Sequence, residues 1–107
     1  MLPRAQRLAG SAQIRHVIRR GHKVPHRLVM CYSLPSESGR AAVVVSKAVG
    51  SAPVRNRVRR RIRHILAEVL PRLTSDVVVR ALPPSAEASW FELREATLAG
   101  LAVSHES

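Results

Sequence analysis

Arginine is the side chain through which this 107-residue chain is best equipped to do chemistry. Six arginines fall within the nine residues from Arg55 to Arg63. The guanidinium group is planar and always charged, and it grips phosphate oxygens through two parallel hydrogen bonds. Neutralising several phosphates also releases condensed counterions, which drives binding to nucleic acid. This spacing therefore predicts a phosphate-binding surface.

Side-chain catalysis and metal binding find no comparable support. The five histidines and the single cysteine, Cys31, lack the spacing of metal ligands, and the seven acids are too scattered to form a carboxylate pair. The stretch VGSAP, residues 49–53, matches neither of the glycine-rich phosphate-binding motifs. We therefore expect no catalytic side chain and no metal ligand in this chain.

An amphipathic helix over residues 52–70 is predicted to position the arginines. Gly50 and Ser51 end the preceding segment, and Pro71 closes the helix. Apolar side chains recur every three or four residues on one face: Val54, Val58, Ile62, Ile65, Leu66 and Val69. Burial of that face would anchor the helix and leave the arginines in solvent as a fixed array.

The arginines are not balanced by acids on the same helix. Arg55, Arg59 and Arg63 align at successive turns. A merely solvated helix face would carry glutamates four residues from its arginines, yet none precedes Glu68. The pattern therefore favours contact with nucleic acid, and it does not separate DNA from RNA or a binding module from an enzyme subunit.

The charge of the whole chain is equally one-sided. The formal net charge is +11: residues 1–64 hold fifteen Lys or Arg against one acid, a net +14, and residues 65–107 hold three basic and six acidic residues, a net −3. Such charge usually serves a polyanionic partner. No apolar run approaches the roughly 20 residues of a membrane span, and the first ten residues lack the apolar core of a signal peptide. The lone Cys31 fits a cytoplasmic protein, and no membrane contact is expected.

Shorter elements are predicted on either side of the arginine helix. A first helix runs from an N-cap at Ser11 to a stop at Gly21. The turn residues PSESG predict an antiparallel hairpin between two strands, and no pattern supports a further strand at 23–25. The predicted strands cover residues 27–34, 40–47 and 75–82.

A final helix is predicted from the capping box Ser89–Glu92 to about Leu101. The chain is 46% hydrophobic, which suffices for one modest core. The order helix, strand, strand, helix, strand, helix predicts an α+β fold in which helices pack on a small sheet. We expect one domain over residues 1–107, ordered over about 7–101.

The stretch VVVSKAVGSAPVRNRVRRRIRHIL, residues 43–66, closely resembles the signature of the bacterial ribonuclease P protein subunit. In that family a strand ending in Ser-Lys leads through a glycine-containing turn into a helix beginning Arg-Asn-Arg. Here these are Ser46, Lys47, Gly50 and the triplet 55–57. RLAGSAQIRHVIRRG, LVMCYSL and SDVVVRA are similar to further family segments, so the resemblance covers most of residues 7–100.

The resemblance implies an α/β sandwich of three helices on a mostly antiparallel sheet. It implies a left-handed crossover through the arginine helix, as in the second domain of ribosomal protein S5. It also implies a protein that joins a large catalytic RNA, the complex removing the 5′ leader of precursor tRNA by Mg²⁺-dependent hydrolysis. The RNA would hold the reaction centre and most of the Mg²⁺, and the protein would bind the leader and stabilise the RNA and its metal ions. No obligatory protein partner is implied.

Two sets of site residues carry over from the resemblance. The leader cleft would be lined by Ile14, Ile18 and Tyr32. Phe is common in the family at the two isoleucine positions, and Ile cannot stack on a base, a loss of about 1–3 kcal/mol per stack. Tyr32 is therefore the one stacking platform expected. The catalytic RNA and its metal-rich region would be faced by Arg55, Asn56, Arg57, Arg59, Arg60, Arg63, Lys47 and Ser46.

A second hypothesis is a non-catalytic small basic protein that associates with ribosomal RNA. Such a protein would share the charge and the sandwich but would not prefer tRNA precursors that carry a leader. A DNA-binding architectural protein is least favoured, because the arginine helix offers only Asn56 as a neutral base-reading residue.

Overall fold

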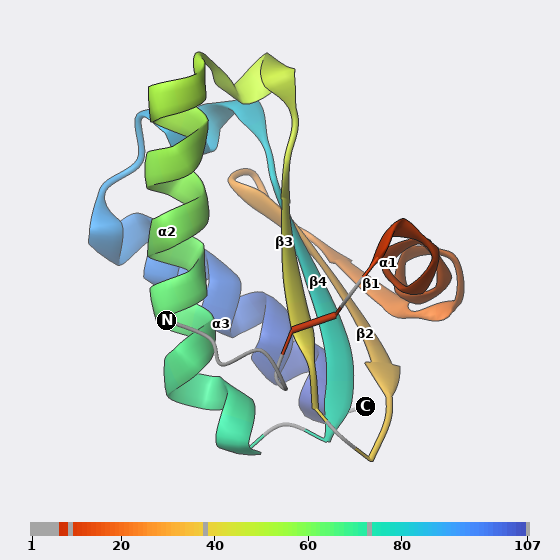
Figure 1. Cartoon of the computed structure of the whole chain (residues 1–107). Coiled ribbons are helices and arrows are strands. Elements are labelled where there is room, and N and C mark those ends of the chain that lie inside the picture. Colours follow the sequence, from red (N-terminus) through yellow and green to blue (C-terminus); the bar gives the residue numbers. More distant parts are fainter. Residues whose placement is uncertain (1–6, 9, 38, 73, 107) are drawn as a thin grey trace.

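The fold is one four-stranded sheet with helices on both faces. A computed structural model describes residues 7–8, 10–37, 39–72 and 74–106. Helix α1 (Gly10–Arg20) lies on one face, and α2 (Ala52–Val69) and α3 (Trp90–Glu106) lie on the other (Figure 1). The strands are β1 (His22–Pro25), β2 (Val29–Pro35), β3 (Ala41–Val45) and β4 (Ser75–Ala81). Short 3₁₀ turns are η2 (Lys47–Val49), η3 (Leu70–Arg72) and η4 (Pro83–Ala86). The predicted α+β class is confirmed.

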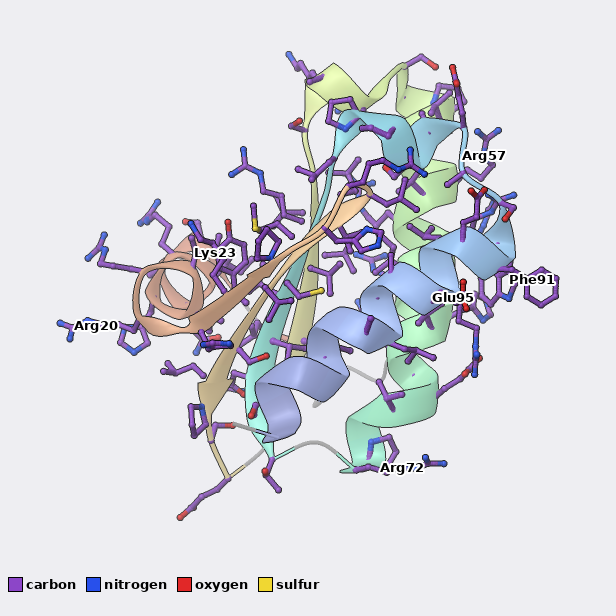
Figure 2. The ribbon with its side chains drawn as sticks, turned by 180° about the vertical axis from the view of Figure 1, so that it is seen from behind. Arg20, Lys23, Arg57, Arg72, Phe91 and Glu95 are labelled. Atoms are coloured by element: carbon purple, nitrogen blue, oxygen red, sulfur yellow. The ribbon has the colours of Figure 1, made fainter. Side chains whose placement is uncertain are left out.

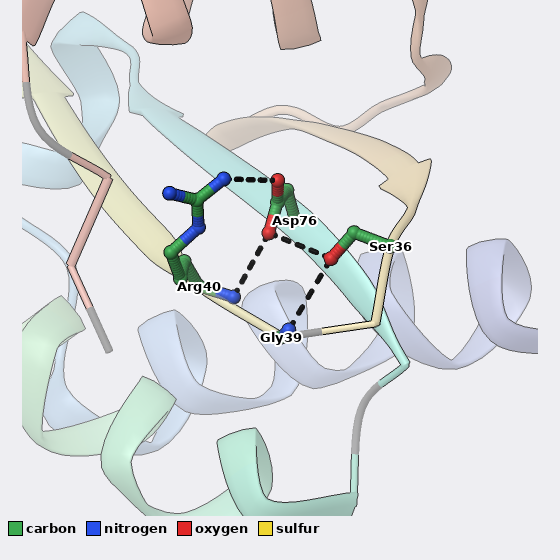
Figure 3. A network of polar contacts seen from close by, with 4 residues as sticks. All are labelled: Ser36, Gly39, Arg40 and Asp76. Carbon is green, nitrogen blue, oxygen red and sulfur yellow. Dashed lines mark hydrogen bonds and ion pairs between the residues drawn. The ribbon is translucent and has the colours of Figure 1, made fainter. Parts of the chain in front are cut away.

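The strand order β1-β2-β4-β3 corrects the predicted hairpin. Strands β2 and β3 follow each other along the chain, but β4 lies between them, antiparallel to β2 and parallel to β3. The reason is that β4 brings a nearly buried carboxylate, Asp76, to the connection between β2 and β3. Asp76 Oδ1 accepts hydrogen bonds from Ser36 Oγ at 2.8 Å and from the Arg40 amide at 3.1 Å (Figure 3). Ser36 and Arg40 are thus both bonded to the start of β4, and the connection does not close a two-strand turn.

The parallel pair β3 and β4 is joined through α2, so the predicted crossover through the arginine helix is present. The predicted range of that helix, 52–70, agrees with the observed Ala52–Val69. Gly50, just before it, has a φ of 155°, in the region that favours glycine, and a Cβ there would lie 3.0 Å from a Val54 methyl group. The turn into α2 therefore depends on a glycine at this position.

Strand β1 is an element that the sequence reasoning did not support. It has only four residues, too few to show an alternating pattern, and it pairs antiparallel with β2 so that Lys23 lies opposite Tyr32. Gly21 allows the entry into β1, since a Cβ there would lie 2.8 Å from the Ser33 carbonyl oxygen. The strand forms because the backbone at Gly21 can approach β2 closely, and a hydrophobic repeat plays no part in it.

The two faces of the sheet bury two apolar clusters. The larger lies under α2 and α3 and includes Val58, Ile62, Ile65 and Leu66 of the predicted stripe. The smaller lies under α1 around Val17. Helix α1 begins at Gly10, so Ser11 lies in its first turn and is not its N-cap. The stop at Gly21 is confirmed, because α1 ends at Arg20.

Helix α3 begins where the capping box predicts. The Ser89 amide donates to Glu92 Oε1 at 2.8 Å, and the Glu92 amide donates to Ser89 Oγ at 3.1 Å. The helix continues to Glu106, past the predicted end near Leu101. Leu93, Thr97 and Leu101 are buried, so this side of α3 faces the core.

Candidate nucleic-acid interface

Burial of the α2 stripe fixes which way the arginines point. Val58, Ile62 and Leu66 are at most 1% exposed. The rest of the helix surface carries polar and charged residues: Asn56, Arg57 and Arg60 are exposed, and Arg55, Arg59, Arg61 and Arg63 are partly buried. The predicted array of guanidiniums on an anchored helix is therefore present.

Four of the predicted RNA-facing residues line one hollow of about 200 Å³: Asn56, Arg59, Arg60 and Arg63. Within it Arg59 Nη1 donates to Asn56 Oδ1 at 2.8 Å. That bond holds one guanidinium in place and leaves its other N–H groups for a ligand. A hollow lined by three guanidiniums and an amide is suited to phosphate oxygens.

A second pocket of about 120 Å³ shares Arg63 with the first and lies toward α1 and the edge strand β3. Ile14 lines it together with Arg7, a residue that the sequence reasoning did not select. The Leu8 amide donates to the Ala41 carbonyl at 2.9 Å, which lays residues 7–8 along β3 and brings Arg7 to this place. The only sequence signal was the Arg-Leu pair at the start of the family-like segment.

Like charges crowd at the junction of the two pockets. The pKa of Arg63 is lowered by its burial and by the positive charges of Arg59 and Arg7. A cluster of this kind is stabilised when an anion comes to lie between its members. Arg63 thus connects the arginine face to the α1 side of the molecule.

Arg57 and Arg61 point to a different part of the structure. Arg57 Nη2 donates to the Ala86 carbonyl at 2.9 Å, and Arg61 Nη1 donates to the Ala88 carbonyl at 3.2 Å. Both bonds tie α2 to the segment that leads from η4 into α3. Arg57 remains exposed, so it keeps donors for a ligand, whereas Arg61 is partly buried.

The remaining predicted residues of this set lie at the start of α2. Arg55 is partly buried, and its Nε is enclosed without a hydrogen-bond partner among the described residues. Ser46 and Lys47 are exposed beside η2, where the Gly50 amide donates to the Lys47 carbonyl at 3.2 Å. The turn places both side chains next to the helix that carries the arginines.

The predicted leader residues Ile14, Ile18 and Tyr32 gather in the smaller apolar cluster under α1. The two isoleucines are partly buried, but Tyr32 is only 6% exposed. So little exposed surface leaves Tyr32 poorly placed to stack on a base, and its role as a stacking platform stays a prediction. Tyr32 belongs to the core because α1 crosses the sheet directly above it.

Helix α1 covers only part of its sheet face, and the uncovered part carries basic residues that the sequence reasoning missed. Met30 is paired with Arg80 across β2 and β4, and Val44 of β3 is paired with Arg80 on its other side. Paired side chains project to the same face, so these residues form an apolar floor with one exposed guanidinium. A charge within the apolar run SDVVVRA was the available signal. Lys23 and Arg20 also lie on the α1 side (Figure 2).

This arrangement fits a known family, whose model, described as ribonuclease P, matches residues 2–103 of the chain. The chain belongs to the ribonuclease P family. Members of the family are protein subunits of an endoribonuclease holoenzyme that also contains an RNA. The chain is accordingly such a subunit, and ribonuclease P RNA is its partner.

Relatives in the ribonuclease P family match nearly the whole chain. The ribonuclease P protein component of Acidothermus cellulolyticus is 44% identical over 99 residues, which cover 87% of this chain and 82% of that protein. The component of Rhodococcus jostii is 42% identical over 113 residues, covering 94% and 90%. The relatives are therefore similar over their full domain and not over the arginine motif alone.

Solved ribonuclease P proteins share the fold. The Staphylococcus aureus protein superposes with a TM-score of 0.81 at 24% identity, covering 94% of this chain and 95% of that one. The Thermotoga maritima protein gives a TM-score of 0.77 at 18% identity, covering 94% and 96%. The sandwich of three helices on a sheet that the resemblance implied is thus the ribonuclease P protein fold, and the structure adds the fourth strand, β1.

The described residues contain no group of three His, Cys, Asp or Glu side chains that could hold a metal ion. Burial raises the pKa of the Cys31 thiol to about 12, so this cysteine stays protonated and is a poor nucleophile. No helix within the described ranges is both long and apolar enough to cross a membrane.

Proposed function

We propose that this chain assists the catalytic RNA of ribonuclease P in removing the 5′ leader from precursor tRNA in the cytoplasm. The observation that carries the proposal is the pair of adjoining pockets that share Arg63. One opens on the arginine helix and the other on the α1 side of the sheet. A protein that must bind both its RNA partner and a substrate strand needs two binding surfaces next to each other.

The arginine helix would hold the catalytic RNA. Phosphates would lie against Arg59, Arg60 and Arg63, whose guanidiniums line the same hollow. Neutralising closely spaced phosphates lets the RNA fold compactly at lower Mg²⁺ concentrations, because part of the counterion charge is then supplied by the protein. The Mg²⁺ ions of the reaction would be bound mainly by the RNA.

The partly uncovered sheet face would hold the leader. A single strand binds best where basic groups follow its backbone and apolar groups receive its bases. Arg80 and Lys23 are the exposed basic residues of this face, and Met30 and Val44 are its partly buried apolar ones. Because Ile14 and Ile18 replace rings and Tyr32 is buried, leader binding would rest on phosphate and aliphatic contacts, with little stacking.

The test is cleavage of precursor tRNA by the RNA subunit over a Mg²⁺ titration, with and without the protein. We expect the protein to lower the Mg²⁺ concentration needed for half-maximal cleavage. With Arg59→Ala, about tenfold more protein should be needed for the same effect, because one charge-assisted phosphate contact is lost.

Arg72→Ala is the matched control, since Arg72 is exposed at the far end of α2 (Figure 2). Unchanged cleavage with and without the wild-type protein would refute the proposal. Equal binding of precursor and mature tRNA, together with tight binding of ribosomal RNA, would favour the ribosome-associated alternative.

A further inference from the structure

An aromatic ring outside both pockets has no structural role that accounts for it. Phe91, in the first turn of α3, is 78% exposed, and it is the only large apolar side chain so exposed among the described residues. The chain has three aromatic residues in all. Tyr32 is buried in the smaller apolar cluster, and Trp90 packs against the larger one. Phe91 is therefore the one ring of the three that is free to contact a partner.

The ring is held by a rigid part of the structure. The reciprocal hydrogen bonds between Ser89 and Glu92, at 2.8 and 3.1 Å, lock the first turn of α3 around Phe91. The Leu93 amide also donates to the Ser89 carbonyl at 3.0 Å, and Leu93 is fully buried. A ring presented on an ordered helix loses little entropy when a partner stacks on it.

Phe91 adjoins the arginine helix through the segment that precedes it. Arg57 and Arg61 donate to the carbonyls of Ala86 and Ala88, so two arginines of α2 lie against the chain that enters α3. Figure 2 shows Phe91 projecting from the molecule on the same side as Arg57. A strand whose phosphates lie on the arginine helix therefore has the ring at the rim of its binding surface.

The acidic side chains around the Phe91 ring favour contact with a neutral base over contact with a phosphate. Two nearby acids are engaged: Glu68 accepts from Arg94 at 2.9 Å, and Glu92 accepts from the Ser89 amide. Glu87, in the segment before α3, and Glu95, one helical turn after Phe91, have no such partner among the described residues. Their carboxylates repel phosphate, so a strand here would keep its backbone toward Arg57 and offer a base to the ring.

We propose that Phe91 is a stacking site for an unpaired base of the catalytic RNA, at the α3 edge of the surface formed by the arginine helix. The inference rests on the proposed function, because it takes the RNA on α2 as given. Every base has a π-face, and one base stacked on an aromatic side chain is worth about 5- to 100-fold in affinity. The stack adds no phosphate contact, so it would not change the salt dependence of binding.

The experiment measures the dissociation constant of the protein and its ribonuclease P RNA at two salt concentrations. Phe91→Ala should weaken binding about 5- to 100-fold with an unchanged salt slope. Phe91→Trp should bind at least as tightly as wild type, whereas Phe91→Leu, which is apolar but cannot stack, should bind like Phe91→Ala. Thermal unfolding of the three variants should match wild type, because the side chain is exposed.

The outcomes separate this inference from the proposed function. If Arg60→Ala weakens RNA binding and Phe91→Ala does not, the stacking site is refuted and the proposed function stands. Wild-type affinity of Phe91→Leu would also refute it, since an apolar contact would then suffice. If Phe91→Ala changes only the sedimentation of the protein alone, the ring serves a protein contact and the inference is wrong. If wild type does not bind the RNA, both fail together.

Discussion

At the scale of single residues, the arginines of α2 differ in what their guanidiniums contact. Arg60 is exposed and makes no hydrogen bond among the described residues, so all its donors are available to RNA. Arg61 spends a donor on the Ala88 carbonyl and is partly buried. Replacement of Arg61 should therefore act first on the attachment of α2 to α3, and replacement of Arg60 on RNA binding.

Thr97 carries a prediction at this scale. Its side chain is fully buried in α3, and its Oγ1 has no hydrogen-bond partner among the described residues. Thr97→Val removes a desolvated hydroxyl and keeps the shape, so it should raise the free energy of unfolding by about 1 kcal/mol. Urea denaturation measures this change. The control is Thr97→Ser, which keeps the hydroxyl and loses a methyl group, and it should lower the free energy of unfolding. A destabilised Thr97→Val would show that the hydroxyl is satisfied in solution.

At the scale of elements, the sheet order depends on the contact between β4 and the connection from β2 to β3. Asp76, at the start of β4, accepts from the Ser36 hydroxyl, the Arg40 amide and, through Oδ2, the Arg40 guanidinium at 3.1 Å (Figure 3). The Val77 amide donates to the Arg40 carbonyl at 2.8 Å and continues this pairing. These bonds hold β3 against β4, and β3 leads through η2 into the arginine helix.

The carboxylate of Asp76 makes folding pH-dependent. Burial alone would raise its pKa, but the hydrogen bonds from Arg40 and Ser36 and the charge of Arg40 outweigh burial and hold the pKa below its ordinary value. A lowered carboxyl pKa contributes stability that is present above the unfolded value of about 3.9 and is lost as the pH falls through the folded value. Asp76→Asn should cost about 2 kcal/mol at pH 7, and the difference from wild type should shrink below about pH 4.

Denaturant unfolding at a series of pH values between neutral and acid conditions measures this difference. Glu37→Gln is the matched control, because Glu37 is exposed on the same connection. A wild-type to Asp76→Asn difference that stays constant down to acid pH would contradict the proposed role of the charge.

At the scale of the whole molecule, positive charge is concentrated in three elements. The basic residues of α1, β1 and α2 carry most of the +14 of the first 64 residues. In the C-terminal part, Asp76 pairs with Arg40 and Glu68 pairs with Arg94. The basic elements attract RNA over about a Debye length, so they orient the molecule before contact.

The salt dependence of RNA binding reports how many phosphates these basic elements neutralise. Each phosphate contact contributes about 0.7–0.9 to the slope of log K against log salt concentration. Arg60→Ala should reduce the magnitude of the slope by about one contact, whereas Arg72→Ala should leave it unchanged. Filter binding at four salt concentrations tests this. Equal slopes for Arg60→Ala and wild type would show that Arg60 does not contact an RNA phosphate.

The sequence alone determined the features that depend on neighbours along the chain. The i, i+3, i+4 repeat from Val54 to Val69 predicted the limits of α2 and its arginine side, and Ser89 with Glu92 predicted the start of α3. Both helices follow from local geometry, in which a residue three or four positions away decides the outcome. The family was also evident from the sequence, through segments that cover most of residues 7–100, and its model matches residues 2–103.

Only the tertiary structure decided the features that depend on distant contacts. Strand β4 separates β2 from β3 because Asp76 meets a connection 36 residues away at Arg40, and no turn pattern contains that information. Tyr32 is buried because α1 crosses above it, and Arg7 reaches Arg63 because the N-terminal segment pairs with β3. Which side chains share a surface is set by the packing of whole elements, so the composite interface appears only when the chain has folded.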